Sequence, residues 1–166
     1  MNRSSTIHAA PWRTPLLGLC LFSFVLFAFA CAKQRQPSRF LIPKDFVGWV
    51  LIELDVKGAP FPRQEEGHLI FAIPPSGKLA MAGAPQTGWA KDEYFYVDAQ
   101  GVMGPLRITP PGGGGWIWGE GSASFEDSSG TKLSMEHFFV GSELEFQRAP
   151  KLEELMRSKV SEPQTR

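Results

Sequence analysis

Two tryptophans and a glutamate stand close together after a run of four glycines. The segment Pro110–Gly121 reads PPGGGGWIWGEG, and in an extended strand the Trp116 and Trp118 side chains share one face. Two indoles on one face can stack on a sugar or a peptide, and Glu120 adds a carboxylate beside them. The same indoles could equally pack against a core, because large aromatic side chains are interior residues more often than not. Trp116, Trp118 and Glu120 are therefore the candidate ligand platform.

The glycine run does not match a phosphate-binding loop. Such a loop connects a strand to a helix, and the N-terminus of that helix faces the anion. Here the following WIWG alternates like a strand, and no Lys-Ser or Lys-Thr pair comes after the glycines. A flexible loop, or a close approach of backbone beside the bulky indoles, explains the glycines better.

Residues for acid–base or nucleophilic catalysis are sparse. Glu120 with Glu126 or Asp127 could supply a pair of carboxylates, although surface charge is the commoner explanation. No serine stands in a G-x-S-x-G elbow, and Ser122 lies among glycines as it would in an ordinary turn. The sequence leaves the catalytic residues, if there are any, unknown.

Metal ligands are too few for a site. After Cys31 the chain has only two histidines, His68 and His137, and they fall in different expected strands. A metal site needs three or four ligands that converge on one point. Glu136 and His137 are neighbours in the sequence, so in a strand they point to opposite faces. We expect no metal and no cofactor.

The first thirty residues have the order of a signal peptide. Residues 1–15 carry Arg3 and Arg13 and no acidic residue, and Leu16–Ala30 is an uncharged apolar run that ends in a small residue. A basic region, an apolar region and a small residue before the cut define such a leader. We therefore expect residues 1–30 to be a signal peptide.

A lone cysteine follows the leader and is the most specific chemical signal in the chain. The quartet Ala28-Phe29-Ala30-Cys31 resembles a bacterial lipobox, in which the cysteine thiol is alkylated by a diacylglyceryl group. Ala30 fits that pattern, whereas Ala28 and the bulky Phe29 depart from it. Several acyl chains would anchor the chain strongly, because each buried CH₂ adds about 0.8 kcal/mol. Secretion without a lipid and an uncleaved N-terminal helix stay open, the latter because basic residues follow at once.

Composition indicates one β-rich domain behind this leader. The chain has 17 basic and 17 acidic residues, so no net charge attracts nucleic acid. Its 17 glycines and 14 prolines are too many for a helical bundle and suit short strands joined by turns. We expect a lipidated cysteine and flexible tether over residues 31–39, a β-rich domain over 40–160 and a frayed tail over 161–166.

Alternating apolar residues predict the strands of that domain. Val50, Ile52 and Leu54 fall on one face of a strand. Short strands are expected on either side of a turn at 74–77, a hairpin over 94–108, and strands near 116–126 and 132–141. Ser142 and Glu145 have the spacing of a capping box that opens one or two short helices. About seven strands predict a small β-sandwich or sandwich-like barrel with a short C-terminal helix.

Three phrases resemble an uncharacterised family of bacterial secreted proteins and lipoproteins, classed as a domain of unknown function. The phrases are FLIPKDFVG at 40–48, TPPGGGGWIWGE at 109–120 and EHFFVGSELEF at 136–146. Asp45 stands where the family pattern has glycine, and Ser142 stands where it has threonine. The resemblance implies a location and a class but no activity. The stretch from Gly48 to Gly77 is also similar to transthyretin-like and carboxypeptidase-regulatory β-sandwich modules, which is a likeness of fold alone.

Together these features predict an extracytoplasmic lipoprotein of unknown molecular activity, anchored to a bacterial membrane through Cys31 or an uncleaved helix. We expect a non-enzymatic binding or envelope-associated module whose surface loops contact a protein or a glycan. The alternative is a small hydrolase or glycan-processing enzyme that uses the Trp116 and Trp118 strand. The sequence names neither the ligand nor the membrane, inner or outer.

Overall fold

The folded domain begins with a strand that has a buried face. The computed structural model describes residues 33–110, 113–126 and 130–161, so the expected signal peptide and Cys31 lie outside the described residues. Strand β1 (Ser38–Pro43) buries Phe40 and Ile42, which alternate along it and share one face. Gln34 and Arg35 already contact the rest of the domain. The segment expected to be a tether therefore contributes to the fold from Gln34 onwards.

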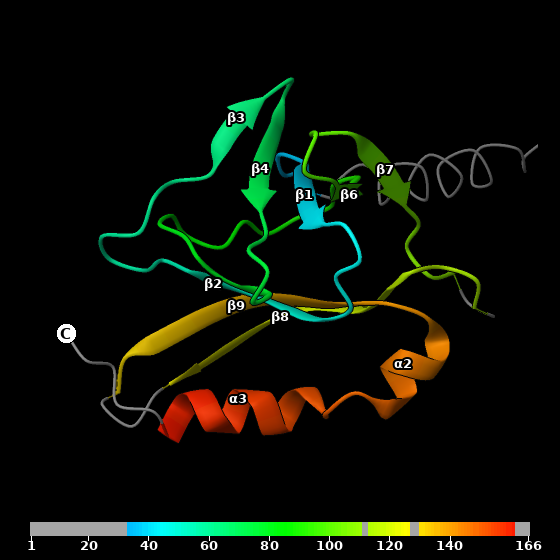
Figure 1. Ribbon diagram of the computed structural model, residues 1–166. Helices are drawn as coiled ribbons and strands as arrows, with labels where there is room; N and C mark the ends of the chain where they lie inside the picture. Colours follow the sequence, from blue (N-terminus) through cyan, green and yellow to red (C-terminus); the bar gives the residue numbers. More distant parts are fainter. Residues whose placement is uncertain (1–32, 111–112, 127–129, 162–166) are drawn as a thin grey trace, which may run out of the picture. The chain divides into compact units, whose positions relative to one another are not determined.

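The strands form two separate sheets (Figure 1). The first sheet has the order β3-β4-β1-β6-β7 and consists of β3 (Arg63–Glu65), β4 (His68–Ala72), β1, β6 (Glu93–Val97) and β7 (Met103–Leu106). The second has the order β5-β2-β9-β8 and consists of β5 (Lys78–Ala80), β2 (Gly48–Leu54), β9 (Lys132–Val140) and β8 (Ile117–Glu126). Strand β1 runs parallel to both of its neighbours, and β2 runs antiparallel to β9.

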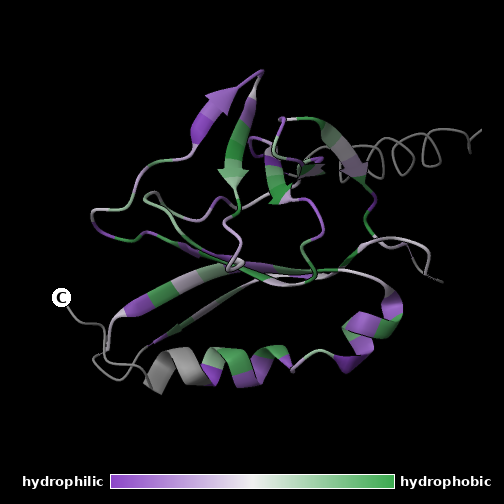
Figure 2. Ribbon diagram, viewed as in Figure 1, coloured by the Kyte–Doolittle hydropathy of each residue, from purple (hydrophilic) through white to green (hydrophobic). Residues whose placement is uncertain are grey.

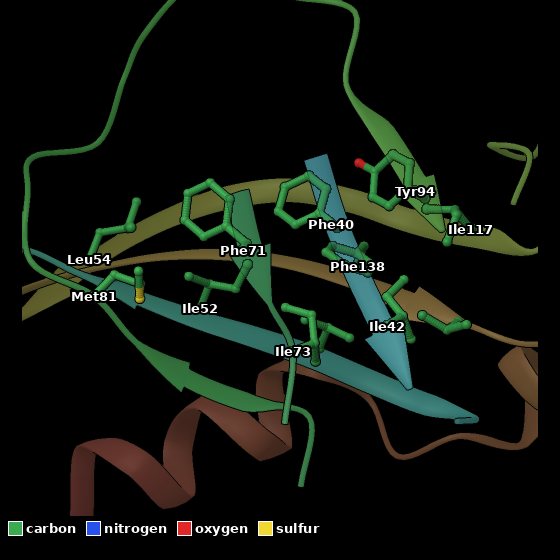
Figure 3. Packing of buried hydrophobic residues seen from close by; sticks show 12 residues of the cluster. Phe40, Ile42, Ile52, Leu54, Phe71, Ile73, Met81, Tyr94, Ile117 and Phe138 are labelled. Atoms are coloured by element: carbon green, nitrogen blue, oxygen red, sulfur yellow. The ribbon is translucent and has the colours of Figure 1, made fainter. Parts of the chain in front are cut away.

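The hydrophobic core lies between the two sheets and is rich in aromatic rings (Figure 3). Phe40 of β1 is at its centre, because its ring centroid lies 5.3 Å from Phe71, 4.9 Å from Tyr94 and 5.0 Å from Phe138. Phe138 belongs to β9 of the second sheet, so these rings join the two sheets directly. Aromatic pairs at such distances are favourable beyond the apolar area that they bury.

The outer face of the second sheet is covered by two helices (Figure 1). Helix α2 (Glu143–Arg148) begins at a capping box made by Ser142 and Glu145, as the sequence predicts. Its Phe146 ring lies 5.9 Å from the Trp49 ring of β2, and Trp49 Nε1 donates to the carbonyl of Pro150 at 2.9 Å. Helix α3 (Leu152–Ser161) follows across the same face. Within the described residues no helix is both long and apolar enough to cross a membrane.

The expectation of a mainly β sandwich with a short helical end is confirmed. The strands of the described residues form two open sheets and no closed barrel. The hairpin of β6 and β7 also forms, with Gly101 donating its backbone N–H to Asp98 in the turn. Two strands, β1 and β3, were not foreseen. Strand β3 is a hydrophilic edge strand (Figure 2), and such strands carry no apolar alternation that a sequence pattern can reveal.

One glycine of the run before Trp116 is required by packing. A Cβ atom at Gly115 would lie 2.3 Å from the Cα atom of Thr109, because Thr109 and Ile117 are joined by a backbone hydrogen bond across this loop. Gly114, in contrast, has open space around it. The close backbone approach expected from the sequence is therefore located at Gly115.

Gly115→Ala should lower the free energy of unfolding by about 2 kcal/mol, the usual cost of forcing extra volume into a packed site. The matched control is Gly104→Ala, since Gly104 has no atom near its missing Cβ and no left-handed backbone angle. Denaturant unfolding of the two variants measures the difference. Equal stability of both would show that the loop moves away from Thr109 at little cost.

Candidate functional site

An irregularity in β8 turns a glutamate toward the space between the sheets. Trp118 pairs with Phe139 and Gly121 pairs with His137, so Gly119 and Glu120 together occupy the place opposite one residue of β9. This is a β-bulge, which re-aims side chains and recurs beside functional sites. Gly119 has a φ of 56°, which favours glycine at the bulge. Glu120 consequently reaches the core side of the sheet.

Tyr94 of β6 meets Glu120 from the opposite sheet. Its ring is buried, and Tyr94 and Glu120 line the same space between the sheets. Burial, followed by the charge of Glu120, raises the pKa of Tyr94 above its usual range. The phenol therefore stays protonated and can donate to the carboxylate.

An ion pair fixes the segment before β1 against the segment before β6. Arg35 Nη1 donates to Asp92 Oδ1 at 3.0 Å, and Nη2 donates to Asp92 Oδ2, so the pair is bidentate. The backbone N–H of Ser38 donates to the same Asp92 Oδ1 at 2.8 Å. The Asp92 side chain is only 6 % exposed, and the pKa of Arg35 is raised chiefly by its hydrogen bond to Asp92. The Arg35–Asp92 pair is therefore largely shielded from water.

Glu136 of β9 faces the same space. It pairs in register with Ile52 and Ser122, on the inner face of the second sheet. Its pKa is raised mainly by burial, and further by the charges of Asp92 and Glu120, whereas Arg35 acts in the opposite direction. A carboxyl group in such surroundings holds its proton more tightly than one in water.

These groups line one cavity, here called the polar cleft, with a volume of about 540 Å³. Its charged and phenolic lining consists of Arg35, Asp92, Tyr94, Glu120 and Glu136. Three serines line it as well, and apolar side chains from the core, among them Phe40 and Phe138, border it. A smaller cavity of about 290 Å³ shares Arg35 and Glu136 with it. A concavity in which polar groups converge beside apolar side chains is a usual form of a ligand site.

The three residues of the expected ligand platform take different positions. Trp118 is half-buried, stacks on Phe146 at 5.5 Å and donates from Nε1 to the carbonyl of Gly141 at 2.9 Å, so it secures α2 to the sheet. Trp116 precedes β8 and is 45 % exposed. Glu120 lines the polar cleft and also a hollow of about 570 Å³ that it shares with Trp118. Trp116 lines neither cavity.

His137 lies on the other side of the sheet from Glu136, as expected for neighbours in a strand. Its ring faces Trp49, with the centroids 6.2 Å apart, and burial lowers the pKa of His137. Its Nδ1 is buried without a hydrogen-bond partner among the described residues. No group of three or more His, Cys, Asp or Glu side chains within that part of the chain is arranged to hold a metal.

Sequence reasoning missed Arg35, Asp92 and the cleft role of Glu136. Glu136 did leave a signal, because it occupies the inward position two residues before buried Phe138. A charged residue at an inward-facing strand position indicates that the hydrophobic core does not extend to that position. Arg35 and Asp92 left none, since both precede strands and meet only in the folded chain.

The chain belongs to a family of unknown function (DUF6843), which matches residues 34–148. This confirms the resemblance to an uncharacterised domain family. The fold is similar to the crystal structure of a Bacillus anthracis protein that is provisionally classed as a lipoprotein, with a TM-score of 0.60 and 18 % identity. That similarity covers 76 % of this chain and 92 % of the other chain. None of the curated proteins matches the sequence.

Arg35→Ala should lower the free energy of unfolding by about 3 kcal/mol, because it leaves the Asp92 carboxylate buried without its counter-charge. The matched control is Arg63→Ala, since Arg63 pairs with Glu65 at an exposed position where such pairs contribute little. Urea denaturation at neutral pH measures both. A loss at Arg63 as large as that at Arg35 would contradict the proposed importance of the buried pair.

Glu136→Gln should raise the melting temperature at neutral pH, and the gain should vanish in acid. The folded-state pKa of Glu136 is raised, so its ionisation costs stability once the pH rises above the ordinary value of 4.5, and the cost is complete above the folded-state pKa. Arg35, Asp92 and Glu120 all contribute to this balance. Thermal melts across the acidic range, with exposed Glu126→Gln as the control, test the sign. A gain that persists at low pH would refute this assignment.

Proposed function

We propose that this protein is an extracytoplasmic lipoprotein, anchored through Cys31, whose β-sandwich domain binds a ligand in the polar cleft and does not catalyse a reaction. The observation that carries the proposal is the polar cleft itself. Arg35 and Asp92 hold each other in place through two hydrogen bonds, and together with Glu120 and Glu136 they line an open volume of about 540 Å³. Such a preformed arrangement suits recognition.

Support for the anchor comes from the sequence of the leader. An uncharged apolar run ends at Ala30, immediately before Cys31, in a quartet that resembles a lipobox. The family model starts at residue 34, just after that cysteine. The fold is also shared with a Bacillus anthracis protein provisionally classed as a lipoprotein. These features favour a folded domain that is tethered to a lipidated Cys31 by a very short linker.

The lining of the polar cleft favours a ligand that brings hydrogen-bond donors. Glu120 and Glu136 contribute two carboxylates, whereas Arg35 and Asp92 are already engaged with each other. Carboxylates accept hydrogen bonds and do not donate them when ionised. Amino groups of a peptide or hydroxyl groups of a glycan would meet this requirement, and the bordering Phe40 and Phe138 would contact their apolar parts.

A second candidate function is a hydrolase or glycan-processing enzyme centred on Glu120. The observation that favours it is the presence of two carboxyl groups with different surroundings in one cavity, Glu136 with a pKa raised by burial and Glu120 in the lining that also contains the Tyr94 phenol. Such a pair can divide the roles of acid and base. In this case Glu120→Gln would abolish turnover of a bound glycan, whereas a binding module would release that glycan unchanged.

Metabolic labelling with a palmitate analogue tests the anchor. Wild-type protein should carry the label, and Cys31→Ala should lose it, because the thiol is the attachment point. Cys20→Ala is the matched control, since Cys20 lies inside the apolar run of the leader, and it should keep the label. Label that persists in Cys31→Ala would refute attachment at this residue.

Titration of the full-length protein with envelope glycan fragments and basic peptides, followed by NMR chemical shifts, tests the polar cleft. Residues of the cleft should shift, and Glu136→Ala should weaken binding about tenfold, the effect of losing one hydrogen bond to a charged group. Glu126→Ala should bind like wild type. Shifts confined to surfaces away from the polar cleft would contradict the proposal.

A further inference from the structure

An exposed tryptophan outside the hydrophobic core lies beside the first residues of the folded domain. Trp89 is 65 % exposed, in the connection between β5 and β6. Its backbone is in a parallel bridge with Gln34, and its carbonyl accepts a hydrogen bond from the N–H of Arg35 at 3.1 Å. Most of this indole is therefore open to solvent, and its backbone is bonded to the first residues of the domain.

The position of Trp89 is fixed relative to those first residues. Asp92, three residues further along, holds Arg35 through two hydrogen bonds and Ser38 through a third. The stretch from Trp89 to Asp92 is thus clamped at both ends against the stretch from Gln34 to Ser38. The exposed indole cannot drift away from the start of the domain without breaking a largely buried ion pair.

Chain length limits how far the start of the domain can lie from the proposed lipid attachment point. Gln34 is the third residue after Cys31, and three residues span at most about 10 Å even when fully extended. The headgroup layer on one side of a bilayer is itself roughly 5–8 Å thick. If acyl chains on Cys31 enter the membrane, the backbone of Trp89 is held at or just above the headgroups.

The residue types suit that location. Tryptophan concentrates at membrane–water interfaces, because its ring is apolar while its N–H can still find a polar partner. Lys91 is exposed two residues later, and a lysine can keep its charge among headgroups while its stem lies along apolar surface. A lysine near the surface is also attracted to anionic lipids.

We propose that Trp89, with Lys91 beside it, docks the domain onto the headgroup layer of the membrane that holds its lipid anchor. This inference rests on the proposed anchoring through Cys31 and adds a second contact that sets the orientation of the domain. The acyl chains would supply the strength of attachment, whereas the contact through Trp89 would fix which face of the domain meets the membrane. Docking also holds Arg35, and with it one wall of the polar cleft, near the membrane surface.

The test uses full-length lipidated protein that is extracted in detergent and returned to vesicles of phosphatidylethanolamine and phosphatidylglycerol. Part of the phosphatidylglycerol carries bromine in its acyl chains, which quenches tryptophan fluorescence on contact. Trp89→Phe is compared with Trp116→Phe, because Trp116 is also exposed but bonds through its backbone to Arg107 and Gly141 and not to the start of the domain. Mass spectrometry of the same samples reports whether Cys31 carries lipid.

Wild type and Trp116→Phe should be quenched to a similar extent, and Trp89→Phe should lose most of that quenching. Equal quenching of all three proteins would overturn docking through Trp89. Docking would also be overturned if the wild-type protein carries lipid on Cys31 and is still not quenched. That outcome includes the case in which a protein partner, and not the membrane, covers the indole. A sample without lipid on Cys31 would overturn the proposed anchoring, and this inference would fall with it.

Discussion

Contact between the rings of Phe40 and Phe138 is the constraint on which the rest of this structure depends. Phe40 comes from the first sheet and Phe138 from the second, with their centroids 5.0 Å apart, so the two sheets cannot separate without exposing the aromatic core. Burial of such rings is the largest favourable contribution that a domain without a disulfide in its described residues can draw on. Strand β1 carries Phe40 in the middle of its sheet, so the first strand of the domain already supplies the centre of the core.

The polar cleft is the place where this aromatic packing ends. Tyr94 belongs to the core through its ring, which lies 5.0 Å from Phe138, and to the cleft through its hydroxyl. Beyond it the inner faces of the strands carry Glu136 and serines in place of apolar side chains. The bulge in β8 adds Glu120 at the same boundary. The side chain of Tyr94 thus joins the packed core to the lining of the polar cleft, so a ligand bound there as proposed would contact a rigid support.

Patterns that repeat along the chain could be predicted from the sequence, and contacts between distant segments could not. The alternation of Val50, Ile52 and Leu54 specified β2 and its buried face, and the spacing of Ser142 and Glu145 specified the start of α2. Trp118 illustrates the limit. The sequence pattern around Trp118 allowed either a ligand platform or a packed side chain. The contact with Phe146 of α2, which the sequence does not reveal, shows that the indole is packed. Arg35 and Asp92 are 57 positions apart in the sequence, and they come into contact only because β1 pairs with β6.

The parallel pairing of β1 also has a kinetic consequence. Its partners, β4 and β6, come later in the sequence, and β2 pairs with β9, the last strand among the described residues. No neighbouring hairpin can complete the core early, so the entropy of closing long loops must be overcome before the main contacts form. Such a topology makes folding slow and dependent on nearly the whole chain. That delay would suit the proposed export, because an exported chain must remain unfolded while it crosses the membrane and fold only on the far side.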